Sequence, residues 1–252
     1  MATRLGRQFS EIVVLVLLAA VCGLAAQGSF TLQQVMSSPF PTELVSAPAG
    51  EDVAWVFNAG GVRNIWMAAP AAEGSYRSRQ LTKYTADDGQ DIAEVTWTPD
   101  GRSIVYARGG DFENDREYPN PASAPEGVEQ DIWMVSTSGG EPRKLAEGHA
   151  PAVSPKGDAV AYVLKDQVWQ INLAAGAKPE QLIHDRGKSG SLRWSPDGSR
   201  LAFVSRRGDH SLVVVYGVAS KNLRYLDPSV DHDSNPAWSP DSRWVAFLRI
   251  PS

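Results

Sequence analysis

The chain has 252 residues and a net charge of −5, and 42% of its residues are hydrophobic. This composition is typical of a soluble globular protein with a sizeable core, and without a basic stripe nucleic acid is not expected as a partner. The 22 glycines and 17 prolines favour a fold with many tight turns over a helical one.

The first 26 residues have the pattern of a signal peptide. Arg4 and Arg7 give a positive start, residues 12–24 are an uninterrupted apolar run, and Ala25 and Ala26 offer a cleavage site. The run is shorter than the roughly 20 residues that span a bilayer, so an uncleaved membrane anchor is the alternative. Cys22 raises the question of a lipid anchor. Val21 before it is bulky, whereas a small residue normally precedes a lipid-modified cysteine, so lipidation is not expected. We therefore expect export to the periplasm or the exterior, and a mature chain without cysteine.

Residues 27–43 form a short lead-in to a motif that recurs five times. Its best copy is Ser-Pro-Asp-Gly at 195–198, and the other copies stand at 47–50, 98–101, 154–157 and 239–242. Serine first, proline second and glycine fourth suit a type I turn. The apolar run after each turn does not alternate with polar residues, so we expect it to be buried on both faces. Trp97, Trp194 and Trp238 stand two residues before a turn proline, and this fixed place marks them as core residues.

Each repeat contains four strand patterns. In the clearest copy the first strand ends at Trp97, the second covers 103–108, the third covers 131–136 and the fourth lies near 143–145. The turn prolines stand at 48, 99, 155, 196 and 240, and the last two intervals match the 40–45 residues of a propeller blade. No segment after residue 27 has a sustained helical period, which excludes a helical solenoid. The sequence predicts an all-β propeller of four-stranded antiparallel blades over residues 44–252.

About four and a half blades are present, because the fifth repeat contains only two strands before Ser252. A propeller closes with about four to eight blades, and an unpaired apolar edge invites aggregation. We therefore expect a longer protein; the alternative is that other residues complete the last blade.

The repeat carries a family resemblance. Residues 194–203, beginning Trp-Ser-Pro-Asp-Gly, resemble the repeat shared by TolB-like periplasmic proteins and the prolyl oligopeptidase family of serine peptidases. Residues 139–151, 205–210, 227–233 and 246–251 resemble the propellers of exported dipeptidyl-peptidase-like and acylaminoacyl-peptidase-like enzymes. The resemblance implies a propeller that restricts access to a following α/β-hydrolase domain with a Ser-Asp-His triad, and that helps to bind the substrate.

The chain departs from that family at the catalytic motif. A nucleophile elbow has the pattern Gly-x-Ser-x-Gly, whereas residues 187–191 place Ser191 where the second glycine belongs, and no helix follows. We expect no catalytic residue in this chain. The dipeptidyl peptidases also hold the substrate's amino group with paired glutamates, and the sequence contains no adjacent Glu-Glu, so the specificity stays open.

A polar insertion at 109–130 contains the candidate substrate-binding residues, which are Asp111, Glu113, Arg116 and Glu117. Carboxylates in a loop that reaches the cavity would bind a peptide's amino end through charge and hydrogen bonds. The same composition is typical of a solvated surface insertion, and that alternative is the default for such a loop.

Two aspartate clusters, 87–91 and 231–233, raise the question of a metal. Calcium takes six to eight oxygen ligands, and the first cluster does not continue into a calcium loop with its closing glutamate. The second, Asp-His-Asp, could supply two or three ligands to a transition metal, but a site needs more. Aspartate is common in turns because it bonds to nearby backbone amides. We expect no metal and no cofactor. The four histidines, His149, His184, His210 and His232, are scattered over the repeats, and loop packing explains them.

Two functional hypotheses follow. In the first, the chain is the propeller of an exported serine peptidase, with a peptide as the ligand of the whole protein. In the second, it is a non-enzymatic periplasmic propeller that binds a protein partner. Contact with a membrane is expected only if the signal segment stays attached.

Overall fold

The computed structural model describes residues 30–110 and 129–252, and the chain divides into two compact units, Met1–Ser38 and Pro39–Ser252. In the first unit, helix α2 (Leu32–Met36) begins with a capping box. The Gln34 amide donates to the Thr31 hydroxyl at 3.1 Å, and the Thr31 amide donates to the Gln34 side chain at 2.9 Å. None of the described helices is long and apolar enough to cross a membrane.

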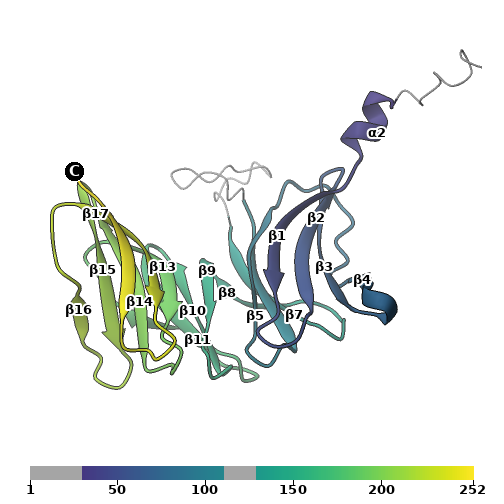
Figure 1. The fold of residues 1–252 in the computed structure, drawn as a ribbon. Helices are drawn as coiled ribbons and strands as arrows, with labels where there is room; N and C mark the ends of the chain where they lie inside the picture. Colours follow the sequence, from purple (N-terminus) through teal and green to yellow (C-terminus); the bar gives the residue numbers. More distant parts are fainter. Residues whose placement is uncertain (1–29, 111–128) are drawn as a thin grey trace, which may run out of the picture. The chain divides into compact units, whose positions relative to one another are not determined.

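The second unit is a series of antiparallel sheets in which strands adjacent in sequence are adjacent in the sheet (Figure 1). Blade 1 contains β1 (Phe40–Ser46), β2 (Val53–Ala59), β3 (Val62–Pro70) and β4 (Tyr76–Gln80), with the short 3-10 turn η1 (Ala72–Gly74) before β4. Blade 2 contains β5 (Ile92–Trp97), β6 (Ser103–Arg108), β7 (Asp131–Ser136) and β8 (Arg143–Glu147). Blade 3 contains β9 (His149–Val153), β10 (Ala159–Leu164), β11 (Gln167–Asn172) and β12 (Glu180–Ile183). Blade 4 contains β13 (Lys188–Trp194), β14 (Arg200–Arg207), β15 (His210–Gly217) and β16 (Leu223–Tyr225).

A fifth blade begins with the antiparallel pair β17 (His232–Trp238) and β18 (Val245–Ile250). A single parallel bridge between Ser211 and His232 connects this pair to blade 4. The predicted four-stranded repeat and its half-complete fifth copy are confirmed, and the fold is an incomplete β-propeller. The first strand starts at Phe40, so the end of the predicted lead-in already belongs to blade 1.

The repeated turn has the hydrogen bonds that its residues predict. In the copies that begin at Thr98, Ser154, Ser195 and Ser239, the fourth residue's amide donates to the first residue's carbonyl at 2.8–2.9 Å. The hydroxyls of Thr98, Ser195 and Ser239 also donate to the turn aspartate, at 2.6–2.7 Å. The first copy differs in that Ala47 has no hydroxyl to donate. Its amide still donates to the carbonyl five residues on, that of Asp52 at 2.8 Å, as the first residue's amide does in the other four copies.

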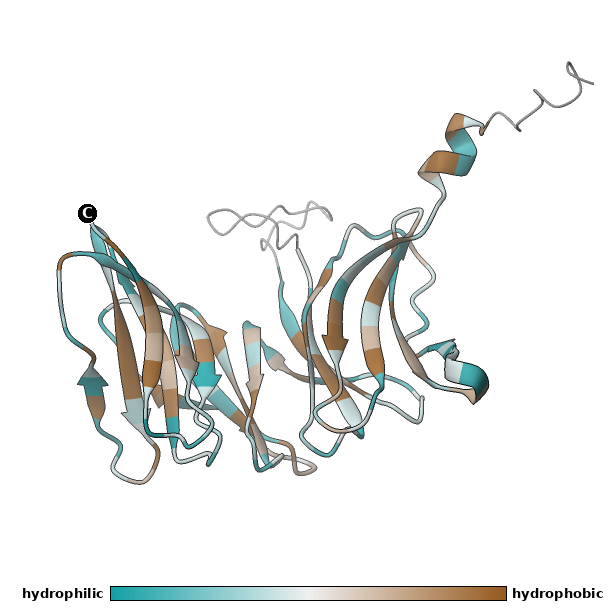
Figure 2. Cartoon of the chain, viewed as in Figure 1, coloured by the Kyte–Doolittle hydropathy of each residue, from teal (hydrophilic) through white to brown (hydrophobic). Residues whose placement is uncertain are grey.

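The hydrophobic core lies between successive blades. Figure 2 shows hydrophobic residues along the strands and hydrophilic residues in many of the connecting loops. Blades 1 and 2 share one buried cluster, blades 2 and 3 a second, and blades 3 and 4 a third. Representative members, in that order, are Ile65 with Tyr106, Ile132 with Tyr162, and Val168 with Phe203. Each blade is therefore stabilised mainly by its neighbours in the series.

Burial on both faces is confirmed for the second strands of the middle blades, β6, β10 and β14. The same prediction is wrong for β2 and β18, in which burial alternates. On β18 the side chains of Leu248 and Ile250 are 58% and 62% exposed. The reason is positional: within the described residues, blade 1 has a neighbour on one side only, and so does the β17–β18 pair.

Candidate functional site

Charged side chains gather at one end of the sheets, which we call the crossover end. Because the strands are antiparallel, the loop that enters a blade and the hairpin between its second and third strands lie at the same end. Ion pairs with distances of 2.5–3.4 Å lie there, among them Arg63–Asp91, Arg108–Asp88, Lys144–Asp131, Lys188–Asp166, Arg207–Asp185 and Arg249–Asp233. The crossover end is thus the polar surface from which a binding site would be built.

Asp185 is one of two of these acids with a fully buried side chain, the other being Asp233. One carboxylate oxygen accepts from the Tyr225 hydroxyl at 3.2 Å and from Arg207 Nη2 at 3.4 Å. The other accepts from the Ser205 hydroxyl and from the Gly187 amide, the latter at 3.0 Å. A buried carboxylate is tolerated only when it is paired and hydrogen-bonded in this way. Asp185 therefore fixes the loop that enters blade 4 against strands β14 and β16.

The same loop is held from the preceding blade. The Asp185 amide donates to Gln167 Oε1 at 2.7 Å, and Gln167 Nε2 donates to the Gly187 carbonyl at 3.2 Å. A Cβ at Gly187 would lie 2.5 Å from the Ser205 hydroxyl oxygen and 2.6 Å from the Arg206 carbonyl oxygen. Glycine is needed here because only its lack of a side chain permits this close approach. The segment is clamped on both sides.

Three cationic side chains lie on and beside the clamped loop. Lys188 and Arg206 are directly opposite each other as the outermost pair of the β13–β14 ladder, and Arg186 stands two residues before Lys188. Lys188 Nζ lies 3.3 Å from a carboxylate oxygen of Asp166. Among the described residues, neither Arg186 nor Arg206 has a side-chain hydrogen bond or ion pair. All three side chains are exposed.

Asp88 and Asp233, two of the aspartates considered as metal ligands, are partners of arginines. Arg108 Nη2 lies 2.5 Å from Asp88, and Arg249 Nε lies 2.7 Å from the buried Asp233. Burial raises the pKa of Asp88, but hydrogen bonds from the Gln90 amide and Arg108 outweigh it and hold that pKa below its usual value. Within residues 30–110 and 129–252, no group of three or more His, Cys, Asp or Glu has the arrangement of a metal site.

The first strands of the blades contact one another in succession, from β1 to β17, and so form the innermost part of the propeller. Each of them has a bulge at a residue with positive φ, five positions before the turn proline: Glu43, Glu94, Ala150, Ser191 and Asn235. Both glutamates reach the next blade. Val95 donates its amide to Glu43 at 3.1 Å, and Ala150 donates its amide to Glu94 at 2.5 Å. The sequence pattern did not reveal this repeated bulge.

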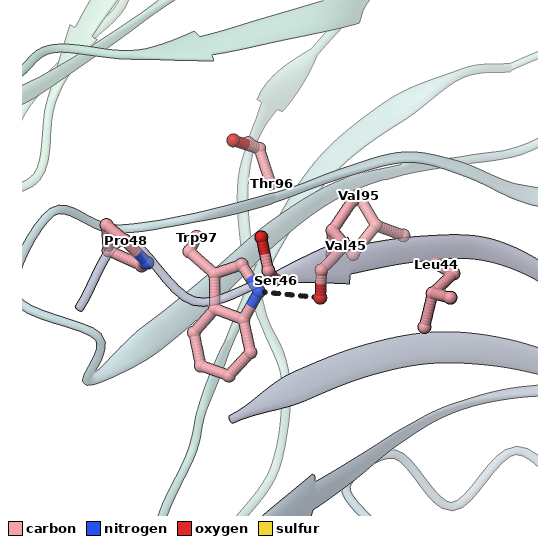
Figure 3. Close-up of a pocket in the computed structure, with 7 residues that line it drawn as sticks. All are labelled: Leu44, Val45, Ser46, Pro48, Val95, Thr96 and Trp97. Carbon is pink, nitrogen blue, oxygen red and sulfur yellow. Dashed lines mark hydrogen bonds between the residues drawn. The ribbon is translucent and has the colours of Figure 1, made fainter. Parts of the chain in front are cut away.

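An open pocket of about 460 Å³ lies against the innermost strands β1 and β5 (Figure 3). Val45, Val95 and Trp97 are among its lining residues, and Trp97 Nε1 donates to the Val45 carbonyl at 3.4 Å. The lining contains no titratable side chain. The pocket offers apolar contact but no group for acid–base chemistry.

The predicted substrate-binding residues Asp111, Glu113, Arg116 and Glu117 lie outside the described residues. The segment that approaches a nucleophile elbow, residues 187–191, lies at the start of strand β13 rather than at a strand-to-helix turn. The Ser189 hydroxyl is buried, and the described residues offer it no hydrogen-bond partner. Among the described residues it therefore has no partner that could act as the base of a nucleophilic serine.

The four histidines stand at strand ends or in loops. His149 begins β9 and is half-buried, and burial lowers its pKa. His210 begins β15, where its ring lies 2.7 Å from the Asp209 carboxylate. His184 and His232 are exposed.

The Asp185 network was not predicted, although the repeat contained a signal for it. Asp185 stands eleven residues before the turn proline Pro196, and Asp88 stands eleven before Pro99. Both aspartates bond to the end of the second strand of the blade that follows.

The repeats and the sheet order define the class: the chain has the fold of a β-propeller, incomplete in the part present, and this fold is similar to that of TolB. No protein-family model matches it. In sequence it is 26% identical over 194 residues to the uncharacterized peptidase YuxL of Bacillus subtilis (strain 168). The aligned region covers 73% of this chain and 24% of YuxL. The chain thus spans about a quarter of the length of that relative.

Two solved structures show the same fold. A puromycin-hydrolyzing peptidase of Mycobacterium tuberculosis gives a TM-score of 0.58 at 18% identity, over 84% of this chain and 35% of that one. TolB from Acinetobacter baumannii gives a TM-score of 0.55 at 16% identity, over 82% of this chain and 48% of that one. The resemblance predicted from the repeats, to TolB-like propellers and to peptidases that contain them, is confirmed.

Proposed function

We propose that this chain is the propeller part of an exported serine peptidase, and that it admits and orients peptide substrates without catalysing their hydrolysis. The observation that carries the proposal is the 26% sequence identity to the peptidase YuxL. The aligned region covers only 24% of the length of YuxL. The fold shared with the mycobacterial peptidase supports it, because there too the similar part is a minor fraction, 35%, of the enzyme. Export rests on the signal-peptide pattern of residues 1–26.

The division of labour can be tested with an activity probe. The complete product of the reading frame and residues 27–252 alone would each be treated with a fluorophosphonate, which labels activated serines. We expect labelling of the complete product and none of the propeller alone. Labelling of residues 27–252, or of neither protein, would contradict the proposal.

Export can be tested separately by fusing a reporter enzyme that is active only outside the cytoplasm to residues 1–40. We expect reporter activity, and we expect its loss when Val14 and Leu17 in the apolar run are replaced by arginine. Activity that persists in the double variant would contradict a signal-peptide role.

Within this function, we assign the polar insertion a role in binding the substrate's amino end. The proposed residues are Asp111, Glu113, Arg116 and Glu117, and the described residues that flank the insertion, Gly110 and Glu129, lie at the crossover end. Exchange of Asp111 and Glu113 for their amides should raise KM for peptides with a free amino end by several-fold. N-acetylated peptides serve as the control, because they carry no charge at that end.

The second candidate function is a non-enzymatic propeller that binds a protein partner, and the fold shared with TolB supports it. The two functions differ in the fluorophosphonate experiment. A complete gene product that stays unlabelled, together with a partner recovered by cross-linking from the periplasm, would favour this candidate.

A further inference from the structure

We propose that Lys188 and Arg206, at the outermost pair of the β13–β14 ladder, form a subsite that binds a carboxylate of a peptide ligand. This proposal deepens the proposed function and rests on it for the choice of a peptide. The strand pairing places both side chains on the same face of the sheet, because residues directly opposite in an antiparallel ladder have Cβ atoms roughly 5 Å apart.

The pairing of two cations is unfavourable by itself. Like charges at opposite cross-strand positions destabilise a sheet. The corresponding outermost pairs of blades 1 and 5 contain no such repulsion, because they are Phe40 with Asn58 and His232 with Ile250. The Asp166 carboxylate, 3.3 Å from Lys188, compensates one of the two charges. Arg206 keeps its charge without an acidic partner among the described residues.

The support beneath this pair is rigid. Asp185 holds the loop before Lys188 through hydrogen bonds with the Ser205 hydroxyl and the Tyr225 hydroxyl, and Gln167 holds it from blade 3. Ser205 immediately precedes Arg206, so the same network also fixes the end of β14. A site whose supporting residues are fixed loses little entropy when it binds a ligand.

The chemistry of the pair selects the ligand. A guanidinium presents a planar fork of N–H donors that matches a carboxylate, and a neighbouring ammonium adds a second charge-assisted hydrogen bond. β13 is an innermost strand, so its first residue lies at the crossover end close to the centre of the propeller. A carboxylate of a peptide that enters there is within reach of both cations.

The test compares two probes, tetra-alanine with a free carboxyl end and the same peptide with an amidated end. Binding to the full chain would be measured by titration calorimetry at low salt. We expect the free carboxylate to bind about tenfold more tightly than the amide, with a preference that weakens as salt is added. Inorganic phosphate is a third probe; if it displaces the free peptide more strongly than acetate does, the site prefers phosphate and the assignment to a peptide carboxylate is overturned.

Arg206→Gln and Lys188→Gln should each remove most of this preference, and Lys178→Gln, which removes an exposed charge at the opposite end of blade 3, should not. Circular dichroism establishes that each variant is folded. Equal binding of the two peptides, or an unchanged preference in Arg206→Gln, would overturn the proposal. Its failure is separable from that of the peptidase function: fluorophosphonate labelling of the complete protein tests the latter alone, whereas the preference for a carboxylate tests this subsite alone.

Discussion

The indole Nε1 of Trp194 donates a 3.0 Å hydrogen bond to the carbonyl oxygen of Ala152, on the innermost strand of the preceding blade. Trp97 and Trp238 make the equivalent bond, to the carbonyls of Val45 and Arg193. The repeated tryptophan is therefore a polar link between blades as well as an apolar residue.

Trp194→Phe keeps most of the ring but removes this donor. We expect the free energy of unfolding to fall by about 1 kcal/mol, the usual net value of one hydrogen bond. Urea denaturation of the purified chain measures it. The matched control is Trp244→Phe, because that side chain is 71% exposed and should change stability by less than about 0.5 kcal/mol. Equal effects of the two substitutions would refute the cross-blade bond.

Tyr106 and Tyr162 occupy the same position of the repeat but differ in their hydroxyl groups. The Tyr106 hydroxyl lies 2.8 Å from that of Tyr84, whereas the Tyr162 hydroxyl has no hydrogen-bond partner among the described residues. Burial raises the pKa of Tyr162 to about 12. Tyr106→Phe should cost about 1 kcal/mol, and Tyr162→Phe should be neutral or stabilising, since it removes an unsatisfied polar group. A loss in Tyr162→Phe as large as in Tyr106→Phe would contradict this account.

Ala150 has a φ of 54° at the bulge of β9, in a region that disfavours residues with a Cβ. Ala150→Gly should raise the free energy of unfolding by about 0.5 to 1 kcal/mol, because relief of this strain exceeds the added flexibility of the unfolded chain. Ala152→Gly in the same strand has no strain to relieve and should destabilise by a similar amount. Thermal unfolding measures the stability of both variants, and a lower stability of Ala150→Gly than of the wild type would contradict the strain at Ala150.

Hydrogen bonds from the Ser195 hydroxyl and from Ser199 lower the pKa of Asp197 from 3.8 to about 2. Because the pKa is lower in the folded state, the stabilisation is complete above about pH 4 and is lost as the pH falls towards 2. Asp197→Asn should therefore have a lower melting temperature than the wild type at pH 5. At pH 2.5 the difference between the two melting temperatures should be smaller. Asp158→Asn, at an exposed aspartate, is the matched control. A constant gap between Asp197→Asn and the wild type at all pH values would contradict the linkage.

The fold could be predicted from the sequence because its signals are local. The turn at Ser195, the strand that follows it and the tryptophan before it all lie within a few residues of one another, and their recurrence gave the blade length. The prediction failed at β18, where burial of both faces depends on a neighbouring blade and not on the strand's own residues.

The candidate site was not predicted in this way, because its contacts join residues far apart in the sequence. Asp185 bonds to Ser205 and Tyr225, which are 20 and 40 residues away. The proposed subsite depends on the strand register that places Lys188 opposite Arg206. Register is set by the bulge in β13, and no periodicity of the sequence indicated a bulge.

The sequence by itself determined the propeller class, the repeat boundaries and the absence of a nucleophile elbow, because turn chemistry and apolar runs act over short distances. Only the tertiary structure decided that the tryptophans link successive blades, that Asp185 is a buried anchor, and that Lys188 faces Arg206. These relationships arise when strands from different parts of the chain pair and pack. The local trace of the Asp185 network, an aspartate eleven residues before the turn proline, does not say which distant residues it bonds to.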